Sequence, residues 1–353
     1  MILPGKIYLW LPSVIYGVVI SLRNRLYNLG IIKSHTFPLP VICVGNITVG
    51  GTGKTPHVLY LTERLSETMQ VSVLSRGYLR KSSGFRIVRS GDSVDNAGDE
   101  PLLMARRISK ANVFVDRNRV HGITEIMRTS PETKAIILDD GFQHRSVKAG
   151  LNILLTSCDR LMTRDHIMPL GRLRESLRGM RRADIIIVTK VPPGIPVAEM
   201  NQIRKEMNID AKQRIYFTSL VYERPVPLFG GAVREIKSTT AVLLVTGIAD
   251  PTPLARYLEG ISAGVTHIVF PDHHRFKGKD LEAITSAFNA LGCDDKIVIT
   301  TEKDGVRLKE ITNIAAHLRE ALYYLPISVN FIENEDEFIK TVHGYTGKSH
   351  RNS

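Results

Sequence analysis

The sequence predicts an α/β protein made of two successive α/β units, and three observations support this prediction. Short apolar runs of strand length alternate with stretches of helical spacing along most of the 353 residues, as is typical of βαβ units. Several of these runs end directly in charged residues, at the edge where a parallel sheet binds its ligands. A turn-rich stretch at 213–240 separates the first series of runs from the second.

Length and composition describe a globular chain with an excess of positive charge. At 353 residues the chain is longer than a typical single domain, and its 43% hydrophobic and 23% charged residues exclude a disordered protein. A net charge of +12 suits an anionic partner such as nucleic acid, acidic lipid or a phosphorylated substrate. The three cysteines are too widely spaced for a disulfide framework or a zinc site, which fits a reducing cytoplasm.

The N-terminal segment 1–28 contains an apolar stretch, residues 7–22, followed at once by Arg23 and Arg25. Because roughly 20 apolar residues are needed to cross a bilayer, this stretch is too short to span one comfortably. Its aromatic residues and the arginines favour an amphipathic helix lying on acidic phospholipid at a membrane surface. A helix packed on the protein's own core is the alternative, since apolar residues at helical spacing are common there.

A glycine-rich loop follows the apolar run that begins at Val41, in the stretch VICVGNITVGGTGKTP. Glycines let successive backbone N–H groups turn toward an anion, and a helix beginning here would direct its positive end to phosphates. The pattern GxxxxGK[ST] is incomplete because Thr48 replaces its first glycine, so a tightly packed turn is the alternative. Lys54 would reach the β- and γ-phosphates and Thr55 would ligate Mg²⁺. The residues expected to contact ATP are Thr48, Val49, Gly50, Gly51, Thr52, Gly53, Lys54 and Thr55.

The run AIILDDGFQH, residues 135–144, has the form of the strand that completes such a phosphate site. Four apolar residues lead into Asp139 and Asp140, and Mg²⁺ is usually held by one or two carboxylates together with phosphates. The pairing of this run with GKT is much more specific than either alone. Residues 29–212 are therefore predicted to form a P-loop NTPase-type α/β/α sandwich that binds ATP and Mg²⁺.

Further charged residues of this unit also come directly after predicted strands or turns. Arg76 and the neighbouring pair Arg117 and Arg119 each follow an apolar run, so an arginine is expected near the phosphates. A polar, turn-rich loop ends in two adjacent carboxylates, Asp99 and Glu100. From the residues alone, Asp99 is either a functional carboxylate or the N-cap of the helix that follows it.

Residues 160–182 are rich in arginine, whose planar side chain binds phosphates bidentately. Within this segment Glu175 is either a structural partner of the arginines or a distant metal ligand. The next apolar run ends at Thr189 and Lys190 but continues with Val191 and Pro192. A guanine-specific GTPase element would place an aspartate there, so a GTP switch protein is disfavoured.

The second half of the chain is predicted to be a β-rich linker at 213–240 and a second α/β domain at 241–343. No second phosphate loop is present in it. Either His273 or His274, after one of its strands, can serve as a base or as the partner of one, because imidazole changes charge near neutral pH. An ordinary surface loop is the alternative for both. The polar tail 344–353 is expected to be disordered.

Taken together, these stretches resemble the tetraacyldisaccharide 4′-kinase family of lipid A synthesis, from the N-terminal helix to about Arg307. The family is similarly irregular at the first glycine of the phosphate loop. The resemblance implies a membrane-associated P-loop kinase of two α/β/α domains joined by a β-linker. It also implies transfer of the ATP γ-phosphate to the 4′-hydroxyl of a tetraacyldisaccharide 1-phosphate, giving the 1,4′-bisphosphate. The similar stretches are VGNITVGGTGKTP, LSRGY, GDEPLLMARR, DDGFQH, GRLRES, PDHHRF and TEKD.

The resemblance also implies roles for individual residues. Asp99 would be the catalytic base, and His273 would polarise it from the second domain. Leu79 departs from the glycine common in the family, and the run DRNRV leaves open whether Arg117 or Arg119 is the family's arginine. The metal ligands would be Thr55, Asp139, Asp140 and Glu175. The acceptor-binding residues would be Arg76, Glu100, Arg119, Gln143, His144 and Arg174.

The implied partners are an acylated disaccharide 1-phosphate and the inner-membrane surface, not nucleic acid. The enzyme is expected to act as a monomer on the cytoplasmic face of the inner membrane of a Gram-negative bacterium, as a peripheral or monotopic protein. An acylated acceptor leaves the bilayer at a cost of about 0.8 kcal/mol per buried CH₂ group, so the enzyme is expected to go to the membrane. The alternative function is a P-loop regulatory ATPase at the membrane surface.

Overall fold

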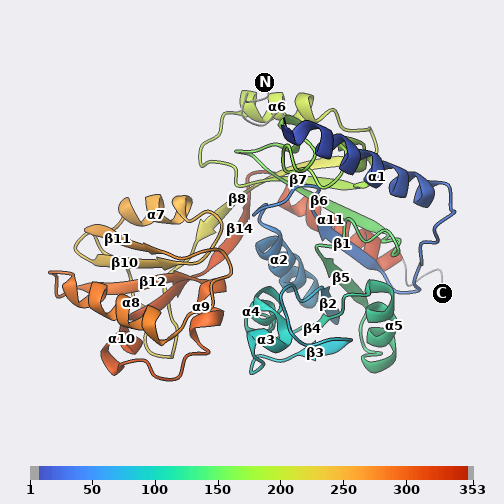
Figure 1. Ribbon diagram of the computed structural model, residues 1–353. Helices are drawn as coiled ribbons and strands as arrows, with labels where there is room; N and C mark the ends of the chain where they lie inside the picture. Colours follow the sequence, from blue (N-terminus) through green and yellow to red (C-terminus); the bar gives the residue numbers. More distant parts are fainter. Residues whose placement is uncertain (1–7, 349–353) are drawn as a thin grey trace.

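Residues 8–348 are described by a computed structural model, which confirms a mixed α/β fold with two mainly parallel sheets (Figure 1). Within these residues the larger sheet has nine strands, in the order β14-β8-β7-β6-β1-β5-β2-β4-β3. Its two edge strands, β14 and β3, are antiparallel to their neighbours. The strands are β1 (Val41–Gly45), β2 (Val71–Ser75), β3 (Arg86–Val88), β4 (Asn112–Val115), β5 (Ala135–Asp139), β6 (Leu151–Ser157), β7 (Ile185–Thr189), β8 (Arg214–Tyr222) and β14 (Ile327–Phe331).

Helices cover both faces of the larger sheet. All five residues of β1 are buried, as expected for a central parallel strand, which forms a continuous apolar run. Ile42 and Val44 belong to the core under α2 and α4, whereas Cys43 belongs to the core under α6 on the opposite face. The helices are α2 (Lys54–Ser66), α3 (Val94–Ala97), α4 (Asp99–Arg107), α5 (Arg119–Thr129), α6 (Val197–Met207) and α11 (Glu335–Lys348), with the 3₁₀ helices η2 (Met162–Arg164) and η3 (Leu177–Arg182).

The smaller domain repeats this layering around its own sheet. In the part of the chain that the structure describes, this sheet has five strands in the order β11-β10-β12-β13-β9, of which β9 is antiparallel. One face packs on α7, and the other packs on α8 and α10. The elements are β9 (Val226–Pro227), β10 (Ala241–Thr246), α7 (Thr252–Glu259), β11 (Gly264–Val269), α8 (Gly278–Ala290), β12 (Lys296–Thr301), α9 (Glu302–Leu308), α10 (Ala316–Ala321) and β13 (Leu322–Leu325).

The chain crosses between the two sheets twice. It leaves the larger sheet after β8 and enters the smaller one at β9, and it returns from β13 to β14 through Pro326. The N–H of Glu223 donates to the carbonyl of Pro326 over 2.9 Å, so the two crossings are bonded to each other. The predicted linker 213–240 therefore needs correction, because its first part, β8, is a full strand of the larger sheet.

The C-terminal boundaries predicted from the sequence are also wrong. β14 pairs with β8 in the larger sheet, so the second domain does not extend to residue 343. Residues 344–348, placed in a disordered tail, belong to α11, where Thr346 is buried and the Tyr345 hydroxyl donates to the carbonyl of Val41 over 3.2 Å. Despite its polar residues, this segment is the end of an amphipathic helix whose apolar side packs on the sheet. Residues 349–353 lie outside the described part.

Helix α1 (Trp10–Asn28) lies against the segment that contains Ile167, Arg174 and Glu175 of the larger domain (Figure 1). The Ser13 hydroxyl donates to the carbonyl of Ile167 over 2.7 Å, and the Tyr16 hydroxyl donates to the carbonyl of Arg174 over 3.0 Å. One side of the helix is therefore fixed to the protein. The other side is apolar and exposed, with Trp10, Leu11, Val14, Ile15, Val18, Val19 and Leu22. Among residues 8–348, none of the helices has the length and apolar character needed to cross a membrane.

We predict that α11 is an integral part of the fold. Phe338 is buried, with its ring centroid 4.8 Å from that of Phe331 and 5.4 Å from that of Tyr216. Phe338→Ala should lower the free energy of unfolding by about 3–5 kcal/mol in urea denaturation, because it leaves a cavity under the sheet. The exposed Lys340→Ala on the same helix should change it by less than about 0.5 kcal/mol. Equal stability of the two variants would contradict this packing.

Candidate active site

The glycine-rich loop lies between β1 and α2 and is fastened from two sides. The side-chain amide of Asn46 donates to the Thr52 hydroxyl over 2.8 Å, and the Thr189 hydroxyl donates to the carbonyl of Thr52 over 2.9 Å. Gly53 has a φ of 79°, a conformation that suits glycine, and gives α2 no side-chain cap. The first N–H groups of α2 are thus available to an anion, and Lys54 and Thr55 are the first residues of this helix.

Two further cations lie at this loop, and no motif in the sequence placed them there. Arg172 and Lys190 come within 4 Å of the positions that side chains at Gly50 and Gly51 would occupy. The N–H of Val49 also donates to the carbonyl of Arg172 over 2.8 Å. The arginine-rich segment and the strand end at Thr189–Lys190 indicated positive charge, but only the fold shows which members reach the loop.

Asp139 and Asp140, at the end of β5, have different environments. Asp140 is 3.0 Å from an Arg174 nitrogen and 3.7 Å from the Lys54 ammonium, and although burial opposes it, these charges lower the pKa of Asp140. Asp139 is buried and accepts a hydrogen bond from the Ser75 hydroxyl over 2.8 Å. Burial, together with the charges of Glu100 and Asp140, raises the pKa of Asp139 to about 7. A cation bound at Asp139 would stabilise the charged form of this carboxylate.

Arg119 is the arginine that faces the site. Its side chain is 1% exposed and donates to the carbonyls of Asp116 and Asp139, in the latter case over 3.2 Å, whereas Arg117 is exposed. Burial lowers the pKa of Arg119 to about 10, so it stays charged at neutral pH. Burial and the charges of Arg119 and Arg76 lower the pKa of His144 to about 4, which keeps this imidazole neutral.

The carboxylate of Glu175 is occupied by hydrogen bonds from several parts of the chain, which favours a structural role over metal binding. It is 1% exposed, and Arg182 donates to both of its oxygens, over 2.8 and 2.9 Å. Asn24 of α1 and Gln143 also donate to it, over 3.0 and 3.2 Å. Of the two roles that the sequence left open, the structure favours the structural one, because each carboxylate oxygen already accepts two hydrogen bonds.

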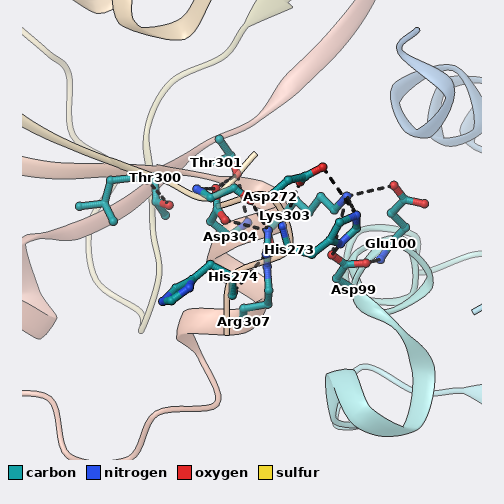
Figure 2. A network of polar contacts seen from close by, with 12 residues as sticks. Asp99, Glu100, Asp272, His273, His274, Thr300, Thr301, Lys303, Asp304 and Arg307 are labelled. Carbon is teal, nitrogen blue, oxygen red and sulfur yellow. Dashed lines mark hydrogen bonds and ion pairs between the residues drawn. The ribbon is translucent and has the colours of Figure 1, made fainter. Parts of the chain in front are cut away.

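Asp99 and His273 meet across the two domains (Figure 2). Asp99 is the first residue of α4, and its N-cap is Gly98, so the N-cap role considered for Asp99 is wrong. Nδ1 of His273 lies 2.9 Å from a carboxylate oxygen of Asp99. Burial alone would raise the pKa of Asp99, but the hydrogen bond from His273 and the charges of Lys303 and Arg307 outweigh it and lower this pKa.

Lys303 completes this group, although the sequence analysis gave it no role. Its ammonium lies 3.7 Å from Asp99, 3.2 Å from Glu100 and 3.4 Å from Nε2 of His273. Despite burial, the carboxylates raise the pKa of Lys303 and keep it charged. The stretch TEKD after a strand was the available indication. The adjacent Asp304 is fully buried and accepts the N–H of Gly247 over 3.0 Å, which fixes the loop beside His273.

The two groups of residues form one site. The carboxylate of Glu100 contacts Lys303, which also contacts Asp99. The charge of Glu100 also raises the pKa of Asp139, so the Asp99 group and the Asp139–Asp140 pair influence each other. Within residues 8–348, no three or more His, Cys, Asp or Glu side chains gather into a metal-binding group. A Mg²⁺ ion that is shared with phosphates needs only one or two carboxylates, and Asp139 and Asp140 fit that requirement. The arrangement suits charge neutralisation and proton removal near a bound phosphate.

Comparison with known proteins identifies the family. A family model described as tetraacyldisaccharide-1-P 4′-kinase, LpxK, matches residues 5–345. The chain is 44% identical to a tetraacyldisaccharide 4′-kinase of Phocaeicola vulgatus, covering 99% of this chain and 98% of the relative. It is 41% identical to one of Bacteroides thetaiotaomicron, covering 99% and 96%.

A solved structure supports the same assignment. The crystal structure of LpxK from Aquifex aeolicus in complex with ATP is 30% identical, with a TM-score of 0.75, covering 95% of this chain and 98% of that one. Fold, motifs and relatives thus agree over nearly the whole chain. The family predicted from the sequence is confirmed, and this chain belongs to the tetraacyldisaccharide 4′-kinase family.

Proposed function

We propose that this protein transfers the γ-phosphate of ATP to the 4′-hydroxyl of a tetraacyldisaccharide 1-phosphate, giving the 1,4′-bisphosphate. The observation that supports this function most directly is the contact between Asp99 and His273 across two domains, 2.9 Å long, beside a phosphate loop. The named relatives support the same activity.

The nucleotide is expected to lie along the glycine-rich loop, with Lys54 on its β- and γ-phosphates. The N-terminal amides of α2, which have no side-chain cap, would donate to the phosphate oxygens. Thr55, Asp139 and Asp140 are the residues that would hold Mg²⁺, which neutralises charge on the transferred group. Arg172 and Lys190, beside the loop, would neutralise further phosphate charge.

Asp99 is proposed to accept the proton of the 4′-hydroxyl as the oxygen attacks the γ-phosphorus. Because its pKa is lowered, the carboxylate is ionised at neutral pH and protonates only well into the acidic range. Nδ1–H of His273 would hold the carboxylate in position, and Lys303 would offset the charge of Asp99 and Glu100. Since these partners come from the second domain, closure would complete the base and exclude water.

The acceptor is expected to bind between α1 and the group formed by Asp99, His273 and Lys303. Arg76, Gln143, His144 and Arg174 are the side chains proposed to contact it. Arg119 is buried against two carbonyls, so its part would be to hold the end of β5 in place beside the phosphates. Gln143 and Arg174 hydrogen bond to each other over 3.3 Å, which would present both together.

The exposed apolar side of α1 is proposed to rest in the cytoplasmic face of the inner membrane. The same helix is hydrogen bonded to Ile167, Arg174 and Glu175, in the segment next to the site. A membrane-bound α1 would therefore bring the site to the level of a lipid acceptor. A regulatory ATPase at the membrane surface is the alternative, but no contact in the described residues favours it.

The function is tested by product formation. Purified protein with ATP, Mg²⁺ and detergent-dispersed disaccharide 1-phosphate should give the 1,4′-bisphosphate, detected by mass spectrometry, and ATP consumption should depend on the acceptor. Asp99→Asn and His273→Ala should each lower kcat by about 10²-fold or more, as expected for loss of general-base catalysis. The exposed Asp294→Asn serves as the matched control. Wild-type kcat in both site variants would exclude this base.

The pH dependence of kcat/KM should distinguish the role of His273 from that of Asp99. Without His273, burial is opposed by fewer favourable contacts, among them the charges of Lys303 and Arg307, so the pKa of Asp99 should rise. The acidic limb of kcat/KM should therefore move to higher pH in His273→Ala than in the wild type. An unmoved limb would show that His273 does not support the Asp99 carboxylate.

The binding of Mg²⁺ with ATP should depend on pH near neutrality. Because the pKa of Asp139 is raised to about 7, this carboxylate is protonated below that pH and is then unable to hold a cation. Calorimetric titration with Mg-ATP should show weaker binding at pH 6 than at pH 8, by up to about tenfold for one pH unit below the pKa. Asp139→Asn should bind weakly at both values. A wild type with equal affinity at both values would contradict the role of Asp139.

The membrane role of α1 is best tested without deleting it, because the helix also supports Glu175. Val14→Asp and Val18→Asp place charges on its exposed side. They should reduce sedimentation with vesicles of acidic phospholipid and activity on bilayer-embedded acceptor, while activity on detergent-dispersed acceptor stays near that of the wild type. Lys212→Ala, on an exposed turn outside α1, is the control. Unchanged sedimentation of both valine variants would exclude membrane binding through α1.

A further inference from the structure

A second cleft, of about 780 Å³, lies between the two domains near the crossings of the chain. Its walls include Arg106 and Arg107 at the C-terminal end of α4, whereas Asp99 begins that helix. Arg107 follows Asp99 by eight positions in this helix, or about 12 Å along the axis. This cleft is therefore distinct from the phosphate loop and from the Asp99–His273 pair.

The positive charge of the cleft is not balanced by its own carboxylates. The two acidic side chains in its walls, Glu223 and Glu302, both pair with Arg107, over 3.7 and 3.0 Å. In the part of the chain that the structure describes, Arg106, Lys309 and Arg319 form no ion pair. Glu310 lies near Arg106, but its carboxylate accepts the N–H of Val94.

Two of these cations, Arg106 and Lys309, are close enough to repel each other, while Lys309 and Arg319 are also exposed to solvent. Partial burial and the neighbouring charge of Arg106 lower the pKa of Lys309. Burial also lowers the pKa of Arg106, which donates to the carbonyls of Ser90 and Val306 over 3.0 and 3.4 Å. An anion placed between these side chains would remove the repulsion and supply the missing partner.

The remaining wall of the cleft is apolar and partly aromatic. It includes Leu228, Phe229 and Tyr324 from the smaller domain. The Arg319 guanidinium lies over the ring of Phe229, with 4.9 Å between its carbon and the ring centroid, so an arginine fork and an apolar surface adjoin. Apolar walls with a few converging charges, in a volume of about 300–1,000 Å³, are typical of small-molecule sites.

We propose that this cleft binds a small organic phosphate, with the phosphate between Arg106, Lys309 and Arg319 and a flat apolar part against Phe229 and Tyr324. The site goes beyond the kinase function and does not depend on the identity of the acceptor. Its walls come from both domains, because Arg106 belongs to the larger domain and the other four residues to the smaller one. A bound anion therefore favours the closed arrangement in which His273 contacts Asp99.

Phenyl phosphate is a suitable probe, because it combines a phosphate with one aromatic ring. The phosphate loop is first saturated with Mg²⁺ and a non-hydrolysable ATP analogue, and the probe is then titrated by calorimetry. The wild type should bind one equivalent with a Kd below about 1 mM, and more tightly than it binds inorganic phosphate. Equal affinity for the two would overturn the aromatic part of the proposal.

Variants locate the binding. Lys309→Ala and Arg319→Gln should each weaken phenyl phosphate binding by about tenfold, equivalent to about 1.4 kcal/mol, and circular dichroism checks that both remain folded. Lys212→Ala, an exposed lysine of the larger domain, should bind as the wild type does. Absence of binding at about 10 mM probe, or unchanged affinity in both cleft variants, would overturn the site. Kinase activity does not enter this test, so it fails or succeeds independently of the proposed function.

Discussion

The hydrogen bond between His273 and Asp99 is the interaction on which the arrangement of this protein depends. Its two members belong to different domains, so the site is complete only when these domains are in contact. The opposite end of α4 is also held by ion pairs, because Arg107 pairs with Glu63 of α2, with Glu223 at the chain crossing and with Glu302 of α9. Helix α4 of the larger domain therefore contacts α9 of the smaller domain at both of its ends.

Burial raises the pKa of both carboxylates of the site, and their partners decide the net direction of the shift. Asp99 is surrounded by His273, Lys303 and Arg307, so it remains charged in a buried position. Asp139 is buried among other carboxylates, so its charge is unfavourable until a cation arrives. Two acidic residues of one site thus differ in how strongly their surroundings favour the charged form. The difference comes from neighbours that lie far away in the sequence.

The sequence predicted the features that depend on local pattern. Buried strands such as β1 and β5 are continuous apolar runs, and the glycines between β1 and α2, followed by Lys54 at the start of α2, form a recognisable local pattern. The positions of β14 and α11, and the parts played by Lys303 and Glu175, required the fold. Each depends on contacts across more than a hundred residues, such as Tyr345 with Val41 or Asn24 with Glu175, which no local pattern encodes.

The insertion of the smaller domain between β8 and β14 has a consequence for biosynthesis. When the ribosome has completed β8, this strand is an unpaired edge of the larger sheet, and its partner β14 emerges only after about a hundred further residues. The larger domain is therefore unable to finish folding before the smaller one has been synthesised. Because the two crossings are joined by the bond from Glu223 to Pro326, early folding of the inserted domain would bring the ends of this gap together. The domain that carries His273 would then also act as the template on which the larger domain closes its sheet.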